Sequence, residues 1–136
     1  MFLNMLNKRE SENFLELAYQ AMKVNGVIKE SEENVFNTFK METNLTDYEV
    51  KGKEIKELVT AFQGSTKRVK KAIIIELAGV LDSDDEVDEN EEKWIINIGN
   101  QWGLRDTELR KMIRWVEDFN DLLLEGYNFI NKNERM

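Results

Sequence analysis

The sequence predicts an all-α fold, a single-domain bundle of about six to seven helices, and three observations support this prediction. Apolar side chains recur every three or four residues through most of the 136-residue chain, which is the period of an amphipathic helix. The chain contains no Pro, so the strongest helix breaker is absent. No segment alternates apolar and polar residues as a half-buried strand does.

The first two helices are expected over about residues 10–24 and 30–43. The first has an apolar face and an opposite polar face, and the polar face comprises Glu12, Glu16, Gln20 and Lys23. Asn25 and Gly26 follow this helix and should end it, because both residue types tolerate positive φ. The second helix turns three residues inward: Val35, Phe36 and Phe39.

A third and a fourth helix follow in the middle of the chain. Thr46 and Glu49 have the spacing of a capping box, which predicts a helix from Thr46 to about Gln63. Gly64 ends that helix. The fourth helix, over about residues 66–82, is apolar nearly all round and is therefore the predicted central helix of the bundle.

The last two helices are expected over about residues 88–102 and from Asp106 to Gly126 or beyond. Asp88, with Glu91 three residues later, suits the N-terminus of the fifth helix. The sixth carries one long apolar stripe, made of Leu109, Met112, Ile113, Val116, Phe119, Leu123, Tyr127 and Ile130. Trp115 lies toward the edge of this stripe and is the predicted exposed aromatic anchor.

An internal repeat appears when the chain is shifted by 59 residues against itself. The shift aligns helix starts, turns and core positions, so that residues 27–33 lie over residues 86–92. We therefore expect one domain, residues 1–136, with a duplicated unit of helix, acidic turn and helix. Repeat one covers about 10–63 and repeat two about 66–126.

Composition excludes several classes of function. The chain has no Cys and no His, which removes disulfides, zinc fingers, thiol catalysis and the usual general base. Its net charge of -8 argues against nucleic acid and anionic membranes as partners. The apolar tract over residues 1–7 is too short to cross a bilayer. A cytoplasmic protein without stable membrane insertion is the expectation.

The turn between the fourth and fifth helices is strongly acidic, with eight carboxylates within eleven residues. Oxygen-only ligands suit hard cations, so the turn is a candidate site for Ca²⁺ or Mg²⁺. The candidate ligands are Asp82, Asp84, Glu86, Asp88 and Glu91. An EF-hand is not expected, because Val87 and Lys93 occupy positions that require Gly and Glu. The alternative is a solvated loop in which Asp88 and Glu91 only cap the fifth helix.

Two further features concern charge. Glu76 falls on an apolar side of the fourth helix, so it should be partly buried and paired with a Lys or Arg.

Basic residues gather early in the fourth and sixth helices, which suits an acidic partner, the acidic turn of another copy, or plain solubility. These residues are Lys67, Arg68, Lys70, Lys71, Arg105, Arg110, Lys111 and Arg114.

The turns resemble those of the tellurite-resistance TerB-like family, whose pattern is an apolar helix followed by Asp-Gly-x-apolar-x-x-x-Glu. The second copy of the pattern covers residues 84–91 and the first covers residues 25–32. Asn25 replaces the Asp of the first copy, and Asp85 replaces the Gly of the second. The resemblance implies an all-helical fold, a cytoplasmic stress-response setting, cation or partner binding at the acidic turns, and no known catalytic activity.

Together these features predict a non-enzymatic helical module whose acidic turn binds a divalent cation or a basic protein partner. The alternative is a protein-interaction domain without metal, and homo-oligomers fit both versions. A carboxylate-based metal-dependent hydrolase is the distant alternative. Without Cys, the chain has no thiolate of its own to reduce or ligate tellurium.

Overall fold

The computed structural model describes residues 1–83 and 87–132, and all regular structure in these residues is helical. This confirms the predicted all-α fold. A 3₁₀ helix and six α-helices follow one another along the chain. They are η1 (Leu3–Met5), α1 (Lys8–Met22), α2 (Glu30–Glu42), α3 (Ile55–Ala61), α4 (Lys67–Leu81), α5 (Glu89–Gln101) and α6 (Asp106–Lys132).

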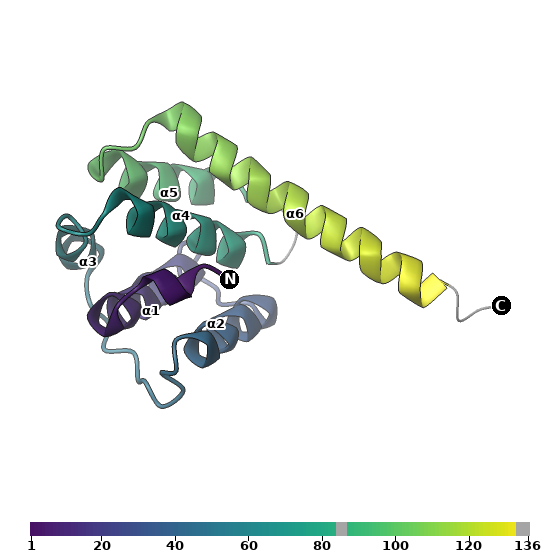
Figure 1. Ribbon diagram of the computed structural model, residues 1–136, viewed down its shortest axis with the longest axis horizontal. Coiled ribbons are helices and arrows are strands. Elements are labelled where there is room, and N and C mark those ends of the chain that lie inside the picture. Colours follow the sequence, from purple (N-terminus) through teal and green to yellow (C-terminus); the bar gives the residue numbers. More distant parts are fainter. Residues whose placement is uncertain (84–86, 133–136) are drawn as a thin grey trace.

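Helix α4 is the centre of the bundle, as its all-round apolar character predicts (Figure 1). It contacts η1, α1, α2, α5 and α6. Ile73, Ile74 and Leu77 in its middle are fully buried. Each such side chain stabilises the fold by about 1.5–3 kcal/mol relative to exposure, so the packing around α4 accounts for much of the hydrophobic stabilisation.

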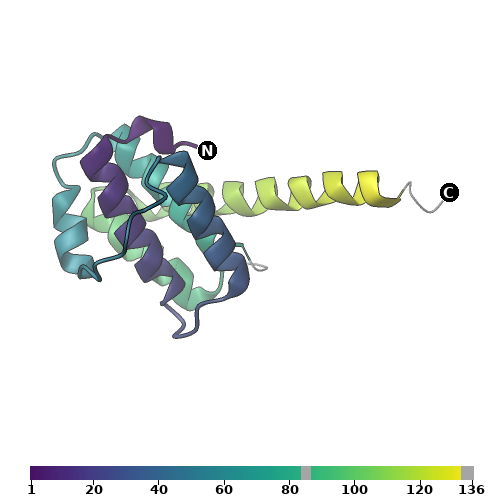
Figure 2. The same ribbon diagram turned by 90° about the horizontal axis from the view of Figure 1, so that it is seen from below.

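Helix α6 is the longest element, and only its first half belongs to the bundle. Its buried residues are Leu109, Ile113 and Val116, and it packs against α4 and α5. Beyond Val116 the helix continues past the edge of the bundle and projects away from it (Figures 1 and 2). At 1.5 Å per residue the 27-residue helix is about 40 Å long.

The helix bounds agree with the proposed repeat. Adding 59 to the bounds of α1 gives those of α4, and adding 59 to the bounds of α2 gives those of α5. The third helices differ greatly, since α3 has 7 residues and α6 has 27. The bounds of the first two helices in each half agree with the predicted repeat and those of the third helices do not, so the duplication stays a prediction.

The third helix starts later than the sequence predicts. Thr46 and Glu49 do not open a helix, and α3 begins only at Ile55. The intervening chain is held in an irregular path because its backbone binds the side chain of Glu16. Gly52 has a φ of +78°, a left-handed conformation that interrupts a helix and that Gly adopts without strain.

Glu16 was predicted on the polar face of the first helix, and that placement is wrong, since the residue is 1% exposed. Its carboxylate accepts the backbone N–H groups of Lys51 at 2.8 Å and of Gly52 and Lys53 at 3.1 Å each. The Tyr48 hydroxyl donates to the same carboxylate. The loop therefore supplies the hydrogen bonds that water would supply on a polar face.

These donors also set the ionisation of Glu16. Burial raises the pKa of the carboxyl, but the N–H donors and the Tyr48 hydroxyl stabilise the charged form more strongly. The net pKa lies below the ordinary range of a Glu carboxyl. Burial and the neighbouring carboxylate raise the pKa of Tyr48, so the hydroxyl stays a donor at neutral pH.

Replacing Glu16 with Ala should lower the free energy of unfolding by about 3 kcal/mol, because buried donors would lose a charged acceptor. Urea unfolding followed by helical circular dichroism measures the loss. Glu57, an exposed carboxylate on α3, provides the matched control. Glu57→Ala should change the stability by less than about 0.5 kcal/mol. Equal effects of the two substitutions would contradict this role of Glu16.

The contribution of Glu16 should also depend on pH. Because its folded-state pKa is lowered, its stabilisation is complete above the unfolded-state pKa and is lost as the pH falls through the folded-state pKa. The difference in stability between the wild type and Glu16→Ala should therefore shrink in acid. A difference that stays constant into strong acid would count against a charged carboxylate.

Candidate functional site

Only three of the five candidate ligands in the acidic turn lie in the described residues. Asp82, Asp88 and Glu91 belong to the described residues, whereas Asp84 and Glu86 lie outside them. The prediction that Asp84 and Glu86 ligate a cation is therefore not tested. The three described candidates each have a local structural contact.

Asp88 and Glu91 form the capping box that the sequence predicts at the start of α5. The Asp88 carboxylate accepts the Glu91 backbone N–H at 2.8 Å, and the Glu91 carboxylate accepts the Asp88 backbone N–H at 3.0 Å. The first of these bonds lowers the pKa of Asp88. Glu91 is 5% exposed, and its burial raises its pKa. Both carboxylates stabilise a helix start.

The corresponding turn of repeat one lies beside this capping box. The Asn25 side-chain amide donates to the Asp88 carboxylate at 2.7 Å. Glu32, the counterpart of Glu91, accepts the Lys29 backbone N–H at 3.0 Å. The starts of α2 and α5 thus form one acidic face. Its exposed carboxylates include Glu30, Glu33, Asp88 and Glu89.

Asp82 has a different role, at the end of α4. It is 5% exposed and accepts the Asn120 side-chain amide at 2.6 Å. This bond joins the C-terminus of the central helix to α6 where α6 leaves the bundle. Asp82 therefore helps to fix the direction of the projecting helix.

These contacts bear on the proposed cation site. Within residues 1–83 and 87–132, no three Asp or Glu side chains converge as a metal site requires. Asp82, Asp88 and Glu91 therefore do not form a ligand set by themselves. The Ca²⁺ or Mg²⁺ site stays a prediction that depends on Asp84 and Glu86.

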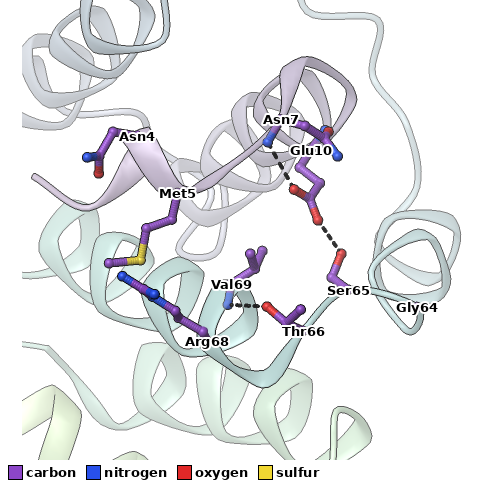
Figure 3. A pocket seen from close by; sticks show the side chains of 9 residues that line it. All are labelled: Asn4, Met5, Asn7, Glu10, Gly64, Ser65, Thr66, Arg68 and Val69. Atoms are coloured by element: carbon purple, nitrogen blue, oxygen red, sulfur yellow. Dashed lines mark hydrogen bonds between the residues drawn. The ribbon is translucent and has the colours of Figure 1, made fainter.

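A cavity of about 600 Å³ lies between the N-terminal segment and the starts of α1 and α4 (Figure 3). Glu10 is its buried carboxylate, and it accepts the Asn7 backbone N–H at 3.0 Å and the Ser65 hydroxyl at 2.6 Å. Thr66 caps α4 by accepting the Val69 N–H at 3.2 Å. Glu10 thus already supplies the negative charge that two helix N-termini favour.

Glu76 is buried with a cationic partner, as predicted, but the partner is not a Lys or Arg side chain. Its carboxylate lies 2.9 Å from the terminal ammonium of Met1 and accepts the Phe2 backbone N–H at 2.7 Å. Glu42 binds the same ammonium at 2.7 Å. The two carboxylates hold the N-terminal segment across α2 and α4.

The projecting half of α6 exposes an apolar surface. Eight large apolar side chains, seven on this half and Trp115 just before it, are 36–67% exposed: Trp115, Phe119, Leu122, Leu123, Leu124, Tyr127, Phe129 and Ile130. Trp115 is exposed, as predicted, and its role as an anchor stays a prediction. The sequence showed the stripe of α6, but its periodicity alone did not show that the bundle ends near Val116.

Aromatic rings and a groove accompany this surface. Trp115 stacks on Phe119 with the ring centroids 5.5 Å apart, and Phe2 lies 6.3 Å from Trp115. A groove of about 670 Å³ lies between α2, α4 and α6. It is lined by Val35, Phe39, Gly79, Asp82, Leu123 and Tyr127, among others.

Among the described residues, no helix combines the length and the apolar character that crossing a bilayer requires.

Comparisons with protein-family models, with curated proteins and with solved structures find no match. The resemblance to TerB-like proteins therefore stays a prediction from the two turn motifs.

The capping role of Asp88 predicts a specific pattern of stability. Asp88→Ala should lower the free energy of unfolding by about 1 kcal/mol, whereas Asp88→Asn should retain most of it, because Asn is also a good N-cap. Thermal unfolding with EDTA, Ca²⁺ or Mg²⁺ measures the stability of both variants. If Asp88 acts only as a cap, the order of stability is wild type, Asp88→Asn, Asp88→Ala in all three conditions. A cation-dependent stabilisation of the wild type that Asp88→Asn removes would show a metal site instead.

Proposed function

We propose that this chain is a non-enzymatic helical module that binds a protein partner through the projecting half of α6, residues 117–132, together with Trp115. One observation carries the proposal, namely the row of large apolar side chains that leaves the bundle with α6. The bundle holds the root of the helix, and the projecting half presents the binding surface. We also propose a cytoplasmic stress-response setting like that of TerB-like proteins, and only the two turn motifs in the sequence support this part of the proposal.

The size of the apolar surface favours a binding role. A large apolar side chain has roughly 150–250 Å² of surface, so eight of them at 36–67% exposure present on the order of 800 Å². The largest apolar patch on a typical monomer is about 300–600 Å². A partner that covers these side chains removes their apolar surface from water, and the hydrophobic effect then stabilises the complex.

The length of the unsupported helix supports the same role. Residues 117–132 of α6 include no buried residue. Most helical stability in proteins comes from packing of an apolar face, and no side chain of this 16-residue segment is buried. A partner along the stripe would supply that packing.

The residue types also suit a protein interface. Trp and Tyr are enriched among the residues that contribute most to binding, and Trp115 and Tyr127 both lie on this surface. Trp115 is held by its ring contacts with Phe2 and Phe119, so it loses little freedom on binding.

The acidic face at the starts of α2 and α5 supports the second candidate, binding of a divalent cation or a basic partner. The Asn25–Asp88 contact is the specific observation, since it joins two acid-rich helix starts. Part of the charge is already neutralised, because Glu89 pairs with Lys93 at 3.2 Å and Glu92 with Arg110 at 3.2 Å. This face is therefore the weaker candidate. The metal-dependent hydrolase stays a distant alternative.

Photocrosslinking tests the proposed function. A benzophenone crosslinker placed at Phe129, which is 64% exposed, should yield a discrete protein adduct in cells that express the chain. The same crosslinker at Val27, 68% exposed in the first turn, is the matched control and should yield none. Absence of an adduct at Phe129, or equal adducts at both positions, would contradict the proposal.

A further inference from the structure

We infer that a second copy of this chain covers the exposed stripe of α6. The two projecting halves pack antiparallel about a two-fold axis at Leu123. This inference rests on the proposed function, because it names the occupant of the surface proposed there. It is carried by the spacing of the stripe, the area it exposes, the placement of charge on α6 and the groove beside α6.

The apolar stripe is symmetric about Leu123. Phe119 and Tyr127 lie four residues to either side, and Val116 and Ile130 lie seven residues to either side. Offsets of four and seven keep all five residues on one side of a helix. In an antiparallel pair related by a two-fold axis, residues at equal offsets on opposite sides of the axis face each other. Leu123 therefore meets its own copy, and Phe119 meets Tyr127. Ile130 of the second copy reaches the edge of the bundle, where Val116 is 5% exposed.

The exposed area falls within the range that a dimer needs. The stripe and its flanking leucines, residues 119, 122–124, 127 and 130, present on the order of 650 Å² of apolar surface, and each partner of a standard-size interface contributes roughly 600–1,000 Å². The proposed contact between two copies also continues the packing of α6 on α4 and α5 within one chain. The side of α6 that packs on α4 and α5 through Leu109 and Ile113 continues beyond the bundle as Leu123 and Tyr127.

Charge does not oppose this pairing. With 3.6 residues per turn, Asp118 and Glu125 lie on the opposite side of α6 from Leu123. Glu117 accepts the Val87 backbone N–H at 3.4 Å, and Asp121 lines the groove at the edge of the stripe. The stripe residues Phe119, Leu123 and Tyr127, which form the centre of the seam, carry no charge at neutral pH. The acidic residues of α6 repel an anionic lipid surface.

The groove beside α6 lies along the proposed seam. Its lining includes Leu123 and Tyr127 of α6, and Val35 and Phe39 of α2 form part of its wall, so the pairing of offsets turns Phe119 and Leu123 of the second copy toward it. Ile130 of the second copy faces Val116, which is 5% exposed and lines a smaller pocket of about 90 Å³. The two-fold axis fills both grooves in the same way, which gives a closed dimer.

Light scattering coupled to gel filtration tests the inference on the purified full chain. The wild type should have twice the 16.0 kDa of one chain. A residue on the two-fold axis meets its own copy, so Leu123→Glu and Leu123→Lys each place like charges together. Each should raise the dimer dissociation constant on the order of 100-fold. Val27→Glu, an exposed position outside α6, is the matched control and should remain dimeric.

Mixing the two variants separates an effect on the interface from an effect on folding. Leu123→Glu and Leu123→Lys chains in equal amounts should form a heterodimer, because opposite charges then meet at the axis. Circular dichroism should show both variants helical. Monomers from each variant alone and a dimer from the mixture support the inference, whereas failure of the mixture to dimerise overturns it.

The remaining outcomes distinguish this inference from the proposed function. A monomeric wild type at all concentrations overturns the second copy as occupant. If crosslinking at Phe129 then captures a different protein, the proposed function stands. A dimer that persists unchanged in both Leu123 variants places the interface elsewhere and overturns the inference. A monomeric wild type without any crosslinked adduct overturns both.

Discussion

The apolar face of α6 is longer than the bundle that covers it, and the proposed function of this protein depends on that mismatch. Leu109, Ile113 and Val116 fix the first half of the helix on α4 and α5. The stripe then continues with the same period into solvent. Because the hydrophobic effect favours the removal of such a surface from water, the helix requires either a partner or partial unfolding of its end.

Buried carboxylates give this acidic chain much of its internal order. Glu16 holds the loop before α3, Glu10 links the starts of α1 and α4, and Glu76 holds the N-terminal segment. In each case N–H or O–H donors replace the water lost on burial, which is the condition for burying a carboxylate at moderate cost. Asp82 uses the same principle to tie α6 to α4 through Asn120.

Much of the fold could be predicted from the sequence because it depends on local patterns. The 3.6-residue period and the caps gave α1, α2, α4 and α5 to within about two residues, which is the usual uncertainty of helix ends. The start of α3 could not be predicted in this way. It depends on a contact between Glu16 and residues 51–53, which are distant in sequence.

The candidate sites were predictable to different degrees. Asp88 and Glu91 have the spacing of a capping box, and the structure shows that capping contact. The binding surface of α6 was only half predictable. Periodicity identifies the residues that share a face, but the extent of the covering bundle is a property of the whole fold. Tyr127 and Ile130 are exposed because α4 and α5 do not extend as far as these residues of α6, and the local sequence pattern cannot predict this extent.

Hydrogen exchange of the α6 backbone amides tests the central claim most directly, because it measures whether the projecting half is covered. The account predicts that amides of residues 120–132 are protected at concentrations where the chain is dimeric. This protection should be lost on dilution, while residues 106–116 stay protected by the bundle. Exchange of residues 120–132 at the rate of an unstructured chain at every concentration would contradict the pairing of two copies through α6.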